Sequence, residues 1–359
     1  MFFSRSKTPA VRLQPVSAAS TSTAKAHPRN RLNDLPSGEW LRRTKSFWLS
    51  TQRSPEVATL ADLATAFTAW LREKAGDEET ERLLGQLSES FVYSIAPPRD
   101  LLKSRHPATF SEVDIERLIT LFTKSGEVVL DPFAGVGSSL VAALRTDRRG
   151  VGIELSPEWA EIASERLRIE AERLGAEPGS GPEVVVGDSG SVIGRLPAQS
   201  VDYVVTSPPY WAILCKPAGM KTQAERISRG LATDYGHEAA DLGKVEDYRE
   251  FIERLADVLA ECLRVLREGR YMSVIVSDFR HGERFHLFHS DLTEAVERRG
   301  CVLSGLTVLA QDNKTLYPYG IPYAFVSNVH HQYILTFRKP RPKRAATPRL
   351  VDAGRTALA

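Results

Sequence analysis

The chain has 359 residues, of which 42% are hydrophobic, enough for one large α/β domain with an appendage or for two domains. No run of 18 apolar residues occurs, which argues against a membrane span, and three widely spaced cysteines provide neither a disulfide framework nor a metal-binding spacing. The net charge of +2 is uneven: residues 1–31 carry six basic and no acidic residues, and residues 339–359 carry six basic and one acidic residue. Residues 32–338 therefore have a net charge of −9, so any affinity for nucleic acid must come from local patches and the tails.

The two ends of the chain have the composition of disordered segments. Residues 1–31 are rich in Ser, Thr, Ala and Pro and are predicted to be a disordered basic arm, and residues 339–359 a disordered basic tail. The arm lacks the long apolar region of a secretory signal and the amphipathic helix of an organelle transit peptide. We therefore expect a cytoplasmic protein, in a bacterial cytosol or nucleoid, which also fits the unpaired cysteines.

Residues 32–100 are predicted to form a mostly helical extension. Between Val57 and Lys74 the apolar residues recur at helical spacing. Trp40, Trp48 and Trp70 are expected to pack this extension onto the main domain, because large aromatic side chains dominate cores.

From Ser111 onward the pattern is that of a doubly wound α/β sheet. The predicted strands are 127–131, 149–154, 183–187, 201–206, 271–277, 301–310 and 331–338, with helices between the first five. A long polar and aromatic stretch joins the last two, which predicts an antiparallel hairpin that closes a mostly parallel sheet. The expected fold class is therefore α/β and Rossmann-like.

Polar residues follow three of these strands in succession. Asp131 begins the stretch Asp-Pro-Phe-Ala-Gly-Val-Gly-Ser-Ser, in which glycines between a strand and a helix let a ligand approach the backbone. The spacing does not fit the Gly-x-Gly-x-x-Gly dinucleotide fingerprint. Glu154 and Asp188 end the next two strands. Either acid alone is more commonly a helix cap, but three polar strand ends on one edge indicate a ligand-binding crevice.

The fourth strand ends in Thr-Ser-Pro-Pro-Tyr-Trp, residues 206–211. Two consecutive prolines fix two φ angles and remove two backbone donors, so the turn is stiff and leaves carbonyls unclaimed. Such a turn can grip a flat polar ring, although it can also be a simple tight turn. The weakly periodic segment 211–246 that follows is too long for an ordinary connection, and such loops tend to be functional or mobile.

These motifs together resemble the S-adenosylmethionine-dependent DNA methyltransferases that modify exocyclic amino groups. The resemblance rests on residues 131–137 followed by Ser-Pro-Pro-Tyr at 207–210, which is similar to the gamma order of motifs in that family. Residues 106–110, 152–158 and 330–337 also resemble family segments, so the likeness covers about residues 101–338. Ser138 and Ser139 stand where threonines are more usual. The resemblance implies a seven-stranded methyltransferase sheet, a domain over 101–338 and S-adenosylmethionine as cofactor.

The resemblance also assigns roles around the cofactor. Glu154 would bind the ribose hydroxyls and Asp188 the adenine amino group. The methionine end would be enclosed by His106, Pro107, Asp131, Phe133, Gly135, Gly137 and Ser138. No metal is expected.

The chemistry of amino methylation explains the second motif. The lone pair of an exocyclic amine is delocalised, so Ser207 and the Pro208 carbonyl would accept its N–H bonds and turn the lone pair toward the methyl group. Pro209 stiffens the turn, and Tyr210 would stack on a base flipped out of the duplex. Since segment 211–246 directly follows this motif, we expect it to be the main DNA-facing loop, and further contacts to the substrate are expected from Trp211, Lys216 and Lys221.

We expect a site-specific DNA methyltransferase of the restriction-modification type that acts on double-stranded DNA. Ser207, in place of Asp or Asn, favours N4 of cytosine as the acceptor. The alternatives are an adenine-N6 DNA methyltransferase, an RNA methyltransferase and a DNA-binding module that does not catalyse. Candidate basic patches for the nucleic acid are Arg42-Arg43-Lys45, Lys103 with Arg105, Arg148-Arg149 and residues 216–229.

Overall fold

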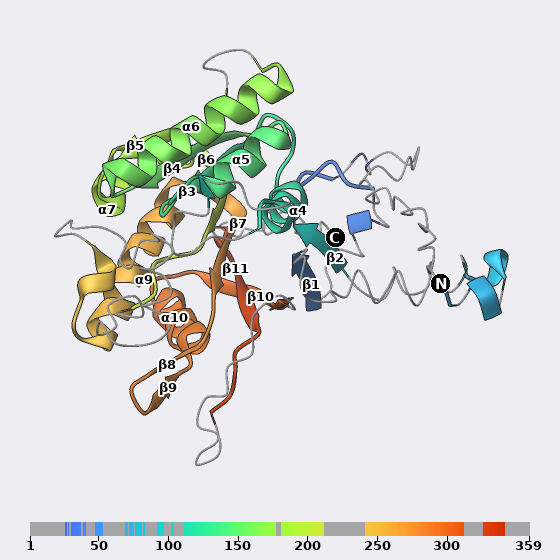
Figure 1. Cartoon of the computed structure of the whole chain (residues 1–359). Coiled ribbons are helices and arrows are strands. Elements are labelled where there is room, and N and C mark those ends of the chain that lie inside the picture. The colour runs from blue at the N-terminus through green and yellow to red at the C-terminus, as the bar shows by residue number, and fades with distance from the viewer. Residues whose placement is uncertain are drawn as a thin grey trace, which may run out of the picture.

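The computed structural model describes residues 111–176, 181–211, 241–311 and 326–341, together with parts of 26–103. In these residues a twisted sheet lies between two layers of helices (Figure 1). The sheet has nine strands in the order β2-β1-β10-β11-β7-β6-β3-β4-β5. Their bounds are β1 Phe47–Gln52, β2 Val92–Ala96, β3 Val128–Asp131, β4 Arg149–Glu154, β5 Glu183–Val186, β6 Val201–Thr206, β7 Leu266–Val276, β10 Val302–Gln311 and β11 His331–Arg338.

Seven adjacent strands of this sheet correspond to the seven predicted strands, which confirms the α/β fold class. Strands β5, β4, β3, β6 and β7 run parallel, and β11 is antiparallel to both β7 and β10. The chain reverses its direction of winding between β3 and β6, and in open α/β sheets ligands bind beside such a switch point. Strand β7 begins at Leu266, five residues before its predicted start.

Helices cover both faces of the sheet, because successive residues of a strand point to opposite faces and both faces carry apolar side chains. Val129, Tyr203 and Val205 pack in one core cluster with the inner sides of α4 and α5, whereas Leu130 and Val204 pack in another with α7, α9 and α10. Helix α6 lies against α5 (Figure 1). The helices are α4 Glu112–Phe122, α5 Ser138–Arg145, α6 Pro157–Leu174, α7 Ser189–Arg195, the 3-10 helix η2 Leu242–Lys244, α9 Tyr248–Val265 and α10 Phe288–Glu297.

The extension over 32–100, predicted to be mostly helical, also contributes strands to the sheet. Two of its segments, β1 and β2, are strands that lengthen the sheet beyond β10. Trp48 of β1 is buried in the core below α4, and Trp40 packs against the same cluster, as expected. Trp70 is 53% exposed, so the prediction that it packs on the main domain is wrong.

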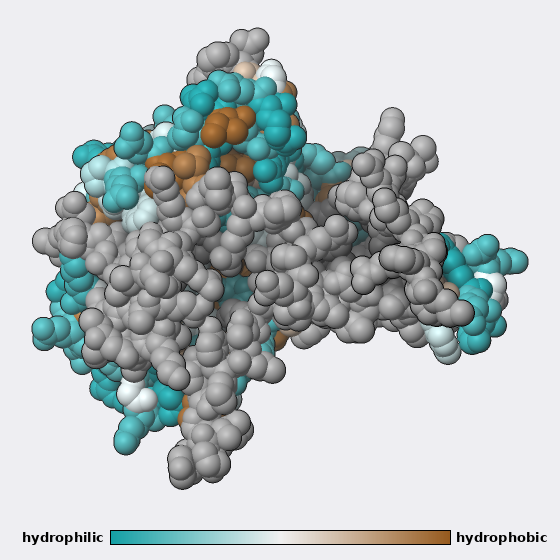
Figure 2. Space-filling model, in the orientation of Figure 1, coloured by the Kyte–Doolittle hydropathy of each residue, from teal (hydrophilic) through white to brown (hydrophobic). Residues whose placement is uncertain are grey.

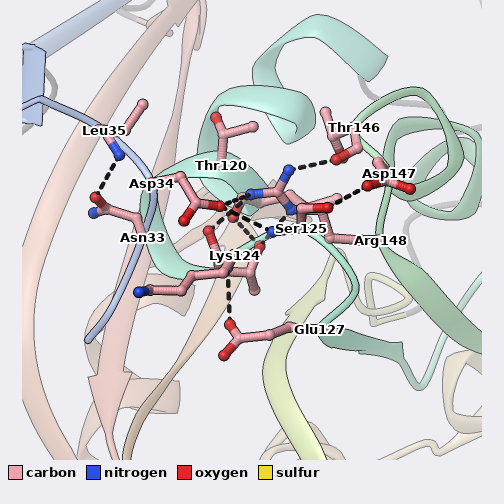
Figure 3. Close-up of polar contacts among 12 residues, drawn as sticks. Asn33, Asp34, Leu35, Thr120, Lys124, Ser125, Glu127, Thr146, Asp147 and Arg148 are labelled. Atoms are coloured by element: carbon pink, nitrogen blue, oxygen red, sulfur yellow. Dashed lines mark hydrogen bonds and ion pairs between the residues drawn. The ribbon is translucent and has the colours of Figure 1, made fainter. Parts of the chain in front are cut away.

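A short segment near the N-terminus attaches at the end of the sheet where the parallel strands begin (Figure 3). The buried Asn33 donates its Nδ2 hydrogen to the Leu121 carbonyl at 2.8 Å, and Asp34 Oδ2 accepts the Ser125 backbone N–H at 3.0 Å. Both partners lie at the turn between α4 and β3. This anchor therefore lies at the edge opposite to the carboxyl ends of the strands.

Arg148, one of the candidate basic residues for nucleic acid, belongs to this anchor. Its guanidinium donates to the Thr123 carbonyl at 2.8 Å and to the Thr123 hydroxyl at 3.0 Å, and its side chain is 8% exposed. Arg148 thus joins α4 to the start of β4, and the prediction of a surface patch there is wrong for this residue.

A small hairpin that was not predicted follows β7. Strands β8 (Phe279–His281) and β9 (Arg284–His286) pair antiparallel across a two-residue turn in which Gly282 has a φ of 59°. The positive φ is the conformation that glycine adopts without steric cost. The hairpin places the start of α10 beside the end of β7.

The described surface is mostly hydrophilic. Figure 2 shows brown patches in the region where Figure 1 shows α5 and α6, and exposed apolar side chains of α6 and β5 include Ile169, Leu174 and Val186. Among the described residues, no helix combines the length and the apolar character that crossing a bilayer needs.

Candidate functional site

The polar residues singled out in the sequence meet at one edge of the sheet. Strands β6, β3, β4 and β5 are neighbours and parallel, so their carboxyl ends lie side by side. Asp131, Glu154 and Asp188 end or follow β3, β4 and β5, and Ser207 follows β6. The register places Asp131 opposite Gly152 and Glu154 opposite Val186.

Asp131 joins the glycine-rich turn to the end of β6. Its carboxylate is completely buried, and Oδ1 accepts the Phe133 backbone N–H at 3.0 Å and the Thr206 hydroxyl at 2.6 Å. Oδ2 accepts the Ser139 hydroxyl. Burial raises the pKa of Asp131, and the three donors oppose that shift. Neither Thr206 nor Ser139 had a predicted site role; Thr206 is 75 residues from Asp131 in the sequence, and Ser139 follows it in the same glycine-rich stretch.

The turn that follows Asp131 needs its glycines. Gly135 and Gly137 have φ values of 53° and 75°, which L side chains rarely adopt. A Cβ on Gly137 would also lie 3.0 Å from the Ala163 Cβ of α6. The backbone of the turn therefore lies against α6 without intervening side chains.

Glu154 fixes this turn from the next strand. Its Oε2 accepts the Gly135 N–H at 2.8 Å, and its Oε1 accepts the Ser156 N–H at 2.9 Å. Burial raises the pKa of Glu154, and the charge of Asp131 acts in the same direction. A carboxylate oxygen has two lone pairs, so each oxygen can still accept a hydrogen bond from a ligand hydroxyl.

Asp188 is a helix cap, the commoner structural role for an acid at a strand end. Its Oδ1 accepts the Ser191 N–H at 2.9 Å and begins α7. The next residue, Ser189, donates its hydroxyl to the Pro132 carbonyl at 2.5 Å. The cap thus holds the start of α7 against the beginning of the glycine-rich turn.

A buried ionic network supports the turn from the side of α4 and α6. Glu112 lies 2.5 Å from Lys103 Nζ and 2.6 Å from Arg166 Nη2, with each side chain less than a tenth exposed. Burial alone would raise the pKa of Glu112, but the charges of Lys103 and Arg166 lower it. The Ser138 hydroxyl donates to Glu112 at 3.0 Å, and Arg166 also donates to the Val136 carbonyl.

This network changes the interpretation of two predicted residues. Lys103 was a candidate for a basic surface patch, and that prediction is wrong because the side chain is buried and paired with a carboxylate. Ser138 was assigned to the cofactor, and its hydroxyl faces Glu112 in the supporting network.

The Ser-Pro-Pro-Tyr turn lies directly beyond Thr206. Tyr210 contacts Phe279 and Phe288 edge-on, at ring-centroid distances of 6.4 and 5.8 Å. Gln332 Nε2 of β11 donates to the Tyr210 hydroxyl at 3.4 Å, and burial raises the pKa of Tyr210 to about 12. The neutral phenol is thereby fixed between β11 and the aromatic residues that follow β7.

Trp211 lies in a buried aromatic cluster behind this turn. It is 9% exposed, and its indole N–H donates to the Val245 carbonyl at 2.7 Å. Its ring contacts Tyr248, Phe279, His281 and His286 at centroid distances of 4.6 to 6.5 Å. This position supports the turn from behind, in place of the predicted contact with the substrate.

Four of the predicted site residues lie outside the described residues: His106, Pro107, Lys216 and Lys221. The segment 212–240, most of the predicted DNA-facing loop, lies there too. Among the described residues, no group of three or more metal-ligating side chains occurs.

The order of strands defines a Rossmann-like α/β protein, and its two motifs lie at the carboxyl ends of the strands beside the switch point. Comparison with known proteins then shows which family the chain is similar to. A model of the N6/N4 DNA methylases matches residues 16–165, a range that includes Asp131 and Glu154 and ends before Ser207. Over this range the chain is similar to the N6/N4 amino DNA methyltransferases.

Individual relatives match shorter segments. The chain is 36% identical over 87 residues to the type II methyltransferase M2.DpnII of Streptococcus pneumoniae, which covers 24% of this chain and 32% of that protein. It is 40% identical over 83 residues to M.ScaI of Streptomyces caespitosus, covering 23% and 27%. The chain thus spans about a third or less of the length of these curated relatives.

One solved structure is of interest for its ligand. A Thermus thermophilus protein in complex with S-adenosyl-L-methionine is 29% identical to this chain, with 45% of this chain and 57% of that chain covered. The TM-score is 0.31, which does not establish a common fold.

Proposed function

We propose that this protein transfers a methyl group from S-adenosylmethionine to the exocyclic N4 amine of cytosine in DNA. The observation that carries the proposal is the 2.6 Å hydrogen bond between Thr206 and Asp131. It joins the end of β6, which leads into Ser-Pro-Pro-Tyr, to the start of the glycine-rich turn. A transfer reaction needs its donor and acceptor sites in contact, and a bond between the two motifs supports that arrangement.

The residues at the ends of β3, β4 and β5 fit the proposed cofactor. Gly135 is only partly buried and has a φ of 53°, so a ligand could approach the backbone of the turn there without meeting a side chain. Glu154 would accept hydrogen bonds from ribose hydroxyls, and the second oxygen of Asp188 would accept one from the adenine amino group. The cofactor supplies an electrophilic methyl group on a positively charged sulfur.

The chain's own residues prepare the acceptor. Ser207 Oγ and the Pro208 carbonyl would accept hydrogen bonds from the amino group, so that its lone pair is directed at the methyl group. Such positioning can lower a barrier by several kcal/mol. Tyr210, neutral and fixed by Gln332, would set the plane of the flipped base. Trp211 and its aromatic cluster would support that ring from behind.

A direct experiment is methyl transfer from labelled S-adenosylmethionine to duplex DNA by the full chain, followed by nucleoside analysis. We expect N4-methylcytosine; N6-methyladenine would move the acceptor to adenine, and label only on RNA would exclude DNA. Ser207→Ala should slow transfer by about 10²-fold or more, as for loss of one positioned hydrogen-bonding group, without changing cofactor binding.

Ser200→Ala is the matched control, because Ser200 lies just before β6 at the opposite end of the same strand. It should transfer at the parent rate. A Ser207→Ala protein as fast as the parent would remove Ser207 from the mechanism.

A further inference from the structure

A carboxylate–imidazole pair lies at the same edge of the sheet and has no role in the function described so far. Asp278 is the second residue after the end of β7 and is 4% exposed. Its Oδ1 lies 2.7 Å from His289 Nδ1 and also accepts the His289 backbone N–H at 3.2 Å. Two contacts from one residue fix both the position and the rotation of the imidazole.

The pair adjoins the Ser-Pro-Pro-Tyr turn through several contacts. Strand β7 lies beside β6, with Val274 opposite Thr206, so both strands end at this edge. Phe288, the residue before His289, contacts the Tyr210 ring at 5.8 Å. On the other side, the His289 ring stacks on Tyr333 of β11 at 4.0 Å.

Residues of strand β11 contact both Tyr210 and His289. Gln332, which donates to the Tyr210 hydroxyl, precedes Tyr333 in the chain, and the Tyr333 hydroxyl lies 3.0 Å from His331 Nε2. The His289 side chain remains 21% exposed, whereas that of Asp278 is 3% exposed. The imidazole is therefore the accessible member of the pair.

Amino methylation needs a proton acceptor at such a place. As the C–N bond forms, the S–C bond breaks and its electrons stay on sulfur, so the positive charge passes to the amino nitrogen. One N–H bond then returns its electrons to nitrogen, and the proton must leave. A histidine whose Nδ1–H donates to a carboxylate carries its lone pair on Nε2 and can accept that proton, and the carboxylate stabilises the imidazolium.

We propose that His289 is the proton acceptor of the transfer and that Asp278 is the residue that positions it. This inference rests on the proposed methyltransferase function, and it holds for an amino group of cytosine or of adenine alike. The charged and titratable groups around the imidazole are Asp278 of the segment after β7, Tyr333 and His331 of β11, and Asp291 of α10, which accepts the Tyr248 hydroxyl at 2.8 Å.

The pair also has a structural effect that an experiment must separate. Asp278 and His289 hold together the two ends of the β8–β9 hairpin. The variant His289→Asn distinguishes the two roles, because its amide N–H can take the place of Nδ1–H toward Asp278 but offers no acceptor at the position of Nε2. A purely structural pair would tolerate it.

The test measures the single-turnover rate of methyl transfer to duplex DNA as a function of pH, with the affinities for S-adenosylmethionine and DNA measured separately. We expect His289→Asn to lower the rate by about 10²- to 10⁴-fold with both affinities within about twofold of the parent. In the parent the rate should fall at low pH as the acceptor becomes protonated, and this acidic limb should be absent in the variant. Asp278→Asn should lower the rate as well, because it disturbs the tautomer.

Glu283→Gln, at an exposed position in the turn between β8 and β9, is the control in the same hairpin and should keep the parent rate. If the parent methylates DNA and His289→Asn is within about threefold of it, or is slow but keeps the acidic limb, the inference is wrong while the proposed function stands. If the parent transfers no methyl group to DNA, the proposed function itself fails.

A second measurement uses His289→Ala with added imidazole. Partial recovery of the rate supports the proposal, and no recovery in a folded protein that binds both ligands contradicts it.

Discussion

The bond between Thr206 and Asp131 makes a quantitative prediction for the variant Thr206→Val. Thr206 is fully buried, and its hydroxyl is one of three donors to the buried carboxylate of Asp131, at 2.6 Å. Valine has nearly the same shape, so packing is retained and only the hydrogen bond is lost. A hydrogen bond to a charged group contributes about 1.5–3 kcal/mol, and we expect the free energy of unfolding to fall by that amount at neutral pH.

The pH dependence of this loss gives a sharper test. Burial already raises the pKa of Asp131, and the Thr206 hydroxyl opposes that rise, so the variant raises the pKa further. A carboxyl whose pKa is higher in the folded than in the unfolded state contributes stability at low pH that is lost as pH rises through the folded pKa. The deficit of Thr206→Val should therefore be largest at neutral pH and should shrink as the pH falls toward the ordinary range of aspartate.

Denaturant unfolding at pH 7.5 and pH 5.0 measures both quantities. Thr206→Ser is the matched control: it keeps the hydroxyl, loses one methyl group worth about 1 kcal/mol, and should show a deficit that does not change with pH. The reasoning would be refuted by a Thr206→Val protein as stable as the parent at pH 7.5, or by a deficit equal at the two pH values. Because the same bond joins the two halves of the site, we also expect slower methyl transfer in Thr206→Val than in Thr206→Ser.

Two further variants test the cofactor side. A Cβ on Gly152 would lie 2.5 Å from Leu140 Cδ1 and 2.9 Å from the Ala134 Cβ, so Gly152→Ala should destabilise the protein by about 1–3 kcal/mol. The second change Leu140→Ala makes room for the new methyl group. The free energy of unfolding of the double variant should therefore fall by at least about 1 kcal/mol less than the sum of the losses in the two single variants. If denaturant unfolding shows that the two losses simply add, the contact between Gly152 and Leu140 is contradicted. In Glu154→Gln an amide NH₂ group replaces one of the two carboxylate oxygens, each of which accepts a backbone N–H. We expect the affinity for S-adenosylmethionine, measured by calorimetry, to fall about tenfold to a hundredfold. An unchanged affinity would exclude Glu154 from the cofactor site.

Local pattern was sufficient to predict the central strands and the polar residues at their ends. Strands β3, β4, β5 and β6 are short apolar runs next to glycine or proline turns, and such signals lie within a few residues. Since parallel strands share an edge, Asp131 and Glu154 could be predicted to lie together once the strands were assigned. The bounds of β4, β6 and β11 are those predicted.

The features that the sequence did not predict either depend on partners far along the chain or are too short to show a pattern. Strands β1 and β2 exist because β1 pairs with β10, which the periodicity of residues 32–100 does not contain. Strands β8 and β9 are three residues each, too short for an alternating pattern to show. The roles of Thr206 and Glu112 follow from buried contacts across the fold, and single polar residues in a sequence do not indicate such partners.

The parallel pairing of β1 with β10 has a consequence for how the chain matures on the ribosome. Phe47 pairs with Val308, about 260 positions further along, so the first strand to be synthesised must wait for almost the last. Until residues 302–311 emerge, β1 can pair only with β2, and the edge of β1 that pairs with β10 stays open. Nascent chains of this protein should therefore carry an undocked N-terminal portion through most of translation, and the final sheet closes only when the two distant segments meet.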